Sequence, residues 1–184
     1  MSDPGDAMLN DVLSEFRKLK RRAERAIAQV DDRSLFAMLD GDANSLAILM
    51  KHIGGNLRSR WTDFLTTDGE KPDRDRDREF VIEPDDTRAR ISERWETGWA
   101  AMLSTLEGLQ PADLQKIVYI RGEAHSVVQA INRALTHTSE HVGQIILLAR
   151  HFAGGRWTTL SIPRGGSAAF NERLKAQGSG LKPA

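Results

Sequence analysis

The stretch INRALTHTSEHVGQIILLAR, residues 131–150, decides the fold expected for this chain. Its apolar residues recur every three or four positions, which is the spacing of an amphipathic helix. We predict a long helix from about Glu123 to Phe152. AGG at 153–155 is expected to end it, because glycine is common at helix C-termini.

Two histidines, His137 and His141, stand four positions apart in this helix. At about 100° per residue they lie about 40° apart on one face, so both rings can point at one ion. Such a pair also occurs on helix surfaces without any metal. Here the same face is mostly apolar, and a buried polar group without a partner is costly. A third ligand from another helix would satisfy the pair, and His52 is the best candidate.

His52 lies in LMKHIGGN (49–56), within a second helix expected over residues 46–65. Gly54 and Gly55 each cost a helix roughly 1 kcal/mol relative to alanine. Glycines are kept in helices where another helix or a ligand must come close. The two glycines therefore favour a close approach beside His52.

Two further helices complete the pattern, from about Met8 to Val30 and from residues 84–87 to about Glu107. The connection at 66–84 is long and carries alternating charges, which are typical of a solvated segment. A connection of this length can cross a bundle and let the next helix run parallel to the last. The sequence thus predicts an all-α, four-helix bundle with a long crossover between helices two and three. A short helix is expected at 167–176, and strand signals are confined to 118–120 and 160–162.

The expected domain organisation is a flexible N-terminus (1–7), one bundle with a C-terminal extension (8–176) and a flexible tail (177–184). Lys plus Arg and Asp plus Glu number 26 each, so the net charge is zero. A balanced chain offers no field for nucleic acid or anionic lipid. The basic run KLKRRAER (18–25) is interpreted as a solvated helix face.

The chain has no cysteine, which excludes disulfides and leaves His, Asp and Glu as metal ligands. No apolar run approaches the roughly 20 residues that a membrane span needs, and no signal peptide is evident. We therefore expect a cytoplasmic protein with no membrane or nucleic-acid partner.

Three segments, MLNDVLSEFRKLKRRAERAI (8–27), SLAILMKHIGGNLRSRW (45–61) and HTSEHVGQIILLAR (137–150), resemble the DinB-like (YfiT-like) superfamily. The likeness covers about residues 8–170, and the HIGGN (52–56) and H-x-x-x-H-x-G-Q-I (137–145) segments are similar to those of an uncharacterised bacterial subgroup. It implies an up-down-down-up bundle and a divalent metal on three histidines, which by position are His52, His137 and His141. It also implies a homodimer. Some members of the superfamily are thiol-dependent, such as mycothiol-dependent maleylpyruvate isomerase and bacillithiol S-transferases.

Three histidines would leave an open coordination position, at which an ion can activate a bound water or a small thiol against a small-molecule substrate. Zinc or nickel is the expected ion, although imidazole also suits copper and iron. Asn56 and Gln144 could each hold an imidazole or a bound water, and Glu140 is the nearest candidate base.

Two alternatives stay open. One is a non-catalytic metal-binding bundle, either a stress protein or a structural dimer. The other is a metallopeptidase, because HTSEH fits the H-x-x-E-H signature with Glu140 as base. His125 and His151 are interpreted as structural, since they lie about 18 Å and 15 Å along the helix from the pair.

Two weaker hypotheses concern other residues. Arg121 and Arg164, the latter in the SIPRGGS turn, could clamp an anionic substrate. Trp61, Trp95, Trp99 and Trp157 are more tryptophans than a small core needs, which favours an interface because aromatic residues are enriched there.

Overall fold

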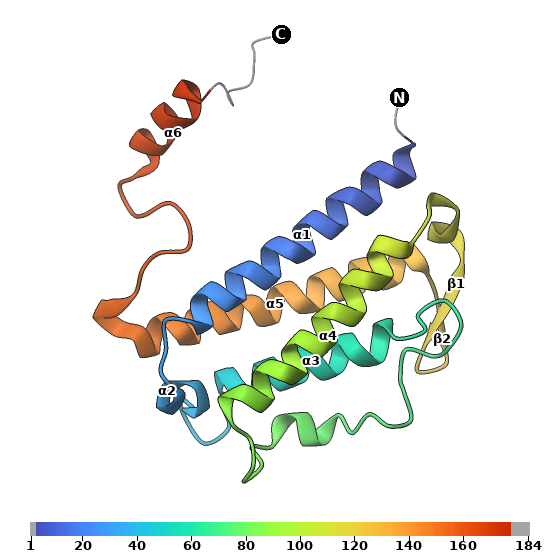
Figure 1. Cartoon of the computed structure of the whole chain (residues 1–184), viewed down its shortest axis with the longest axis horizontal. Coiled ribbons are helices and arrows are strands. Elements are labelled where there is room, and N and C mark those ends of the chain that lie inside the picture. The colour runs from blue at the N-terminus through green and yellow to red at the C-terminus, as the bar shows by residue number, and fades with distance from the viewer. Residues whose placement is uncertain (1–2, 178–184) are drawn as a thin grey trace.

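A computed structural model describes residues 3–177 of the chain and is mostly helical, with one small two-stranded sheet (Figure 1). The α-helices are α1 (Pro4–Ile27), α2 (Asp32–Phe36), α3 (Leu46–Trp61), α4 (Arg88–Gly108), α5 (Val127–Ala153) and α6 (Ser167–Ala176). Short 3-10 helices are η1 (Asp77–Phe80), η2 (Pro111–Gln115) and η3 (Gly154–Arg156). The strands β1 (Ile117–Ile120) and β2 (Glu123–Ser126) form an antiparallel hairpin.

The four long helices pack as two pairs, α1 along α5 and α3 along α4. Glycines allow α3 and α4 to touch, since a Cβ added at Gly98 would lie 2.3 Å from the carbonyl oxygen of Gly54. The two helices run parallel, because Lys51 near the start of α3 reaches Asp86 just before α4. Near their ends, the Thr105 hydroxyl donates to the Trp61 carbonyl at 2.8 Å. The long connection therefore returns the chain to the start of α3.

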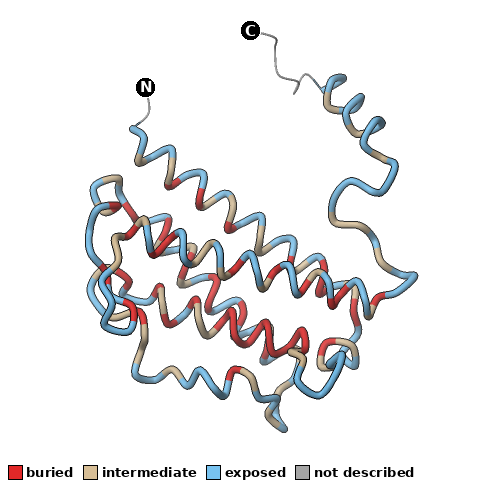
Figure 2. The backbone as a smooth tube through the Cα atoms, turned by 180° about the vertical axis from the view of Figure 1, so that it is seen from behind, coloured by how far each residue is buried: buried red, intermediate tan, exposed pale blue. Residues whose placement is uncertain are grey.

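Buried residues are concentrated on α3, whereas α6 stands away from the body of the molecule and buries none of its residues (Figure 2). Residues 45–54 are all buried. His52 therefore belongs to the most enclosed segment of the fold. Trp61, Trp95 and Trp99 are at most 2% exposed, so three of the four tryptophans belong to the core. The number of tryptophans therefore no longer favours an interface.

Several boundaries differ from those expected. Helix α1 begins at Pro4, inside the segment expected to be flexible, because the Asp3 side chain accepts from the Gly5 N–H and proline suits the first helical position. Flexible segments were expected at 1–7 and 177–184, and of these, residues 1–2 and 178–184 lie outside the described residues. Helix α2 has no counterpart in the sequence prediction.

The fourth long helix begins at Val127 rather than Glu123. Ser126 and Gln129 form a capping box there, and residues 123–126 pair with β1 instead. The hairpin turns through Arg121 and Gly122, which both have positive φ, at 57° and 76°. The other strand signal, at 160–162, forms no strand.

Other predictions are confirmed. Helix α5 ends where glycine was expected to stop it, with Gly154 at φ 55°, and α6 occupies residues 167–176. No helix of the described part of the chain is both long and apolar enough to span a membrane. The chain is thus largely helical as expected, while the finer classification as an up-down-down-up four-helix bundle stays a prediction.

Candidate metal centre

His52, His137 and His141 come together although 85 residues separate the first two. Helix α3 contributes His52, and α5 contributes the other two from successive turns. One ring nitrogen of each lies within 4.8 Å of one nitrogen of each of the others. The ring centroids are 4.6–5.1 Å apart. The convergence predicted from the sequence is therefore present.

A buried carboxylate contacts His52 on the Nδ1 side of its ring. The Nδ1 of His52 lies 2.8 Å from Oε2 of Glu79, whose carboxylate also accepts from Nε and Nη2 of Arg74 at 2.8 and 2.9 Å. Phe80 lies against the same imidazole, with ring centroids 4.7 Å apart. His52 is 3% exposed, so its ring is fixed on the Nδ1 side and can present only Nε2 to the other histidines.

A similar contact orients His141. Its Nδ1 lies 2.8 Å from Oε1 of Gln144, one turn later on α5. An acceptor at Nδ1 assigns the proton to that nitrogen and leaves the Nε2 lone pair available for a cation. The sequence prediction that Gln144 holds an imidazole is supported by this contact.

The Nε2 atoms of His52 and His137 lie 3.0 Å apart. Burial, together with the charges of His141 and His52, lowers the pKa of His137 to about 3. Burial also lowers the pKa of His141, against a hydrogen bond to Gln144 that raises it. Both imidazoles are therefore neutral near pH 7, which is the protonation state that binds a metal.

For Glu79, burial favours the neutral acid, but hydrogen bonds from His52 and Arg74 hold the pKa below its ordinary value. A negative carboxylate behind a ligating histidine raises the basicity of that ligand. The donor set thus fits a divalent cation: three imidazoles converge, and among residues 3–177 no carboxylate joins their cluster.

A cavity of about 490 Å³ lies beside the triad, between α3, α5 and the hairpin turn. His52 and His137 line it, as do Asn56 and Glu140. Asn56 is half-buried one turn after His52, so it faces whatever occupies the cavity. Glu140 is exposed and is not one of the clustered groups.

Sequence reasoning missed Glu79, Arg74 and Phe80, because it interpreted their segment as a solvated charged run. The structure instead packs that segment over α3, where Glu79 is 8% exposed. Two signals pointed there: the unusual length of the connection, and the glycines after His52. A Cβ added at Gly55 would lie 2.2 Å from Oε1 of Glu79, so glycine makes room for this carboxylate.

The remaining histidines lie outside the cluster. His125 is on β2, not on the fourth helix as expected, and its Nδ1 lies 3.0 Å from the Glu123 carbonyl oxygen. His151 is exposed near the end of α5, beside the ring of Phe152. Of the two arginines suggested as an anion clamp, Arg121 lines the cavity, whereas Arg164 is exposed and does not.

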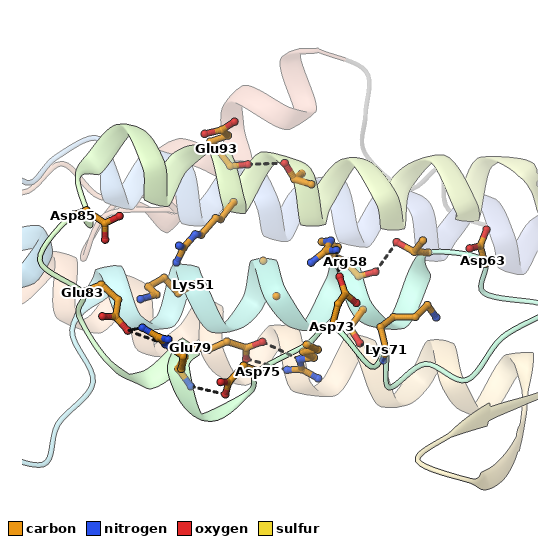
Figure 3. A pocket seen from close by; sticks show the side chains of 18 residues that line it. Lys51, Arg58, Asp63, Lys71, Asp73, Asp75, Glu79, Glu83, Asp85 and Glu93 are labelled. Atoms are coloured by element: carbon orange, nitrogen blue, oxygen red, sulfur yellow. Dashed lines mark hydrogen bonds and ion pairs between the residues drawn. The ribbon is translucent and has the colours of Figure 1, made fainter.

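A second cavity, of about 770 Å³, lies between α3, α4 and the connection (Figure 3). Seven acidic and six basic side chains line it, and many of them pair with one another. Arg58 binds Asp73, and Arg78 binds Glu83 at 2.8 Å. Glu79 lines this cavity and bonds to His52, which lines the other, so the carboxylate stands between the two spaces.

Comparison with known proteins gives one match. The model of a family described as protein of unknown function (DUF1572) matches residues 3–166, which include all three histidines. No curated protein and no solved structure matches the chain.

Proposed function

Because the chain belongs to the family described as protein of unknown function (DUF1572), whose description names no reaction, we propose a function from the site itself. The protein is a metal-dependent enzyme in which His52, His137 and His141 hold one divalent ion, zinc or nickel. The observation that carries this proposal is the convergence of three imidazoles, two of which line a cavity of about 490 Å³.

The ion would lower the pKa of a bound water or small thiol and so supply the nucleophile. Two residues of the chain orient the histidine ligands and fix their tautomers. Glu79 accepts the Nδ1 proton of His52, and Gln144 accepts that of His141, so that both Nε2 atoms stay unprotonated. Asn56 offers an amide to a molecule in the cavity. Since the chain has no cysteine, a thiol nucleophile would come from a low-molecular-weight thiol.

The resemblance to the DinB-like superfamily implies metal ligands at these three histidine positions, and we propose that the four long helices form its up-down-down-up bundle. The parallel course of α3 and α4 supports this order. Transfer of a small thiol, or hydrolysis, is then the reaction class, with a small molecule as substrate.

A non-catalytic metal site would normally be closed by a fourth protein ligand. The cluster contains no fourth ligand among residues 3–177, and the cavity lies beside it, so an open position is favoured. The metallopeptidase alternative needs a further acidic ligand and an inward base. The cluster holds three imidazoles alone, and Glu140 is exposed.

Elemental analysis of metal-loaded protein tests the site. We expect about one ion per chain in the wild type and almost none after combined alanine substitution of His52, His137 and His141. The double variant His125→Ala/His151→Ala is the matched control, because it removes two histidines outside the cluster and should keep its metal. Equal metal content in the wild type and the triple variant would overturn the proposal.

Turnover is tested with bacillithiol, mycothiol and glutathione, each against a chlorinated aromatic acceptor. Thiol-dependent turnover that is lost in His141→Ala supports an enzyme. Peptide cleavage that disappears in Glu140→Gln would instead establish the peptidase. A bound ion that is closed to exchange and gives no turnover would establish the structural role.

The homodimer and the cytoplasmic location remain expectations from the resemblance and the composition. Sedimentation at micromolar concentration tests the first, and a single monomeric species would contradict it.

A further inference from the structure

The cavity beside the triad has a strongly one-sided charge. Five arginines line it, and Glu140 is its one acidic lining residue; the arginines are Arg60, Arg74, Arg76, Arg121 and Arg133. The whole chain has a net charge of zero, so this excess is local. A cleft lined by one sign of charge attracts small ions of the opposite sign.

Carboxylates of the protein neutralise only part of this charge. Glu70 is shared, lying within 3.4 Å of Arg60, Arg74 and Arg121, and Arg74 also binds Glu79. The Nη1 atom of Arg60 is buried and forms an ion pair with Glu70 at 2.9 Å. One carboxylate thus serves three guanidinium groups, and the cavity keeps an excess of positive charge.

Protein carboxylates neutralise Arg133 and Arg76 even less. Arg133 lies one turn before His137 on α5, and no hydrogen bond or ion pair joins its side chain to another residue between 3 and 177. Arg76 lies over the ring of Phe80, and its carboxylate neighbour, Asp77, is 3.7 Å away and 96% exposed. Such an exposed contact contributes little. Two guanidinium groups are thus available to a ligand.

One part of the cavity wall is apolar. Trp61 and Phe64 stack with ring centroids 4.5 Å apart, and Ile120, Ala130 and Ala134 complete this surface. The indole N–H of Trp61 has no hydrogen-bond partner among the described residues. An apolar wall with a few convergent charged groups is typical of a small-molecule site.

We propose that this cavity binds the substrate as a small organic anion. Arg133 and Arg76 hold its carboxylate, phosphate or sulfonate group, since guanidinium pairs well with planar and tetrahedral oxyanions. Trp61 and Phe64 cover its apolar part. A molecule in this cavity also reaches His52 and His137, which line the same space. The inference rests on the proposed function, because it assigns the substrate class to the cavity beside the metal centre.

Titration calorimetry of the full-length, metal-free protein with phenylphosphonate tests this inference, and its neutral dimethyl ester is the reference ligand. Without metal, the phosphonate cannot gain affinity by coordinating the ion. We expect saturable binding of the phosphonate and much weaker binding of the ester. Added salt should weaken the binding, because exposed charges are screened.

Arg133→Gln should weaken phosphonate binding about tenfold, as expected for one charge-assisted hydrogen bond. Arg133→Lys should recover part of the loss. Arg150→Gln is the matched control: it makes the same change at an exposed arginine of α5 that does not line the cavity, and it should bind as the wild type does.

Two separate readouts distinguish the two proposals. Protein that takes up one ion per chain but binds the phosphonate no better than the ester, or equally well in Arg133→Gln, overturns the anion site alone. Protein that binds the phosphonate through Arg133 but takes up no ion supports the anion site and overturns the metal centre.

Discussion

The two cavities on either side of α3 differ in how their charges are used. Between α3 and α4, acidic and basic side chains are nearly balanced, and three ion pairs join them: Arg58 with Asp73, Arg74 with Glu79 and Arg78 with Glu83. Between α3 and α5, arginines dominate, and Arg133 forms no ion pair with any residue from 3 to 177. Charges that neutralise each other fix a fold, whereas charges left over are available to a ligand. The comparison therefore assigns structure to the first cavity and binding to the second.

The largest effect on stability is expected beside the cavity between α3 and α4. Lys51 and Asp86 form an ion pair at 2.6 Å whose side chains are 2% and 0% exposed, and Lys51 also donates to the Val81 carbonyl. Asp86→Ala would leave a buried ammonium without its carboxylate, which typically costs about 3–5 kcal/mol. Urea unfolding monitored by circular dichroism measures the loss.

Asp85→Ala is the control for that variant. Asp85 also lines the cavity and pairs with an arginine, Arg90, but its side chain is 63% exposed. An exposed pair contributes about 1 kcal/mol or less. Similar losses of unfolding free energy in the two variants would mean that the buried pair stabilises the fold no more than the exposed pair does.

The same pair predicts a pH dependence. Burial favours the neutral acid of Asp86, but hydrogen bonds from Lys51 and the Glu83 backbone outweigh it and hold the pKa below the ordinary 3.8. The unfolded chain then takes up this proton at a higher pH than the folded chain. The stabilisation is therefore complete above the ordinary carboxyl pKa and is lost as the pH falls below it. The difference in unfolding free energy between wild type and Asp86→Ala should shrink from pH 7 to pH 3; a constant difference would contradict this.

A smaller effect is expected from Glu79, the carboxylate between the two cavities. Glu79→Gln keeps the shape but removes the charge behind His52, and such changes lower metal affinity about 10- to 100-fold. Competition against a chromophoric chelator measures it. Glu70→Gln is the matched control, because Glu70 also binds Arg74 but makes no contact with a histidine. An unchanged affinity in Glu79→Gln would reduce this residue to a purely structural role.

The smallest effect is expected at Glu140. This side chain is exposed at the rim of the arginine-lined cavity and lies outside the histidine cluster. Glu140→Gln should therefore keep its metal content and most of its turnover, within about twofold, as is usual for surface substitutions. His141→Ala, one residue along, should lose both. A large loss in Glu140→Gln would show that the rim carboxylate takes part in the chemistry.

Periodicity alone was enough for the helical parts of the site. The four-residue spacing of His137 and His141 and the surrounding apolar face placed both rings toward α3. The two glycines after His52 indicated a close approach, and the structure shows two of them: α4 against Gly54, and Glu79 against Gly55. Gln144 followed from its place one turn after His141.

Periodicity did not predict the structure of the connection at 66–84. Alternating charges have no apolar period, so nothing local distinguishes a buried Glu79 from its exposed neighbours such as Asp77. The strand signal at 118–120 is confirmed by β1, but the second strand and the hairpin were missed, because a two-stranded hairpin depends on the pairing of segments rather than on either segment alone. These errors have one origin: each feature is stabilised by contacts between segments.

The sequence by itself determined the long helices and the histidines that could share an ion. Such features are local, since hydrophobic spacing and capping act within a few residues. Only the tertiary structure decided that Glu79 stands behind His52 and that five arginines line one cavity while balanced charges line the other. Burial and ion pairing depend on which segments meet in space. The signs of two neighbouring charges along the chain do not reveal whether they will neutralise each other or remain free for a ligand.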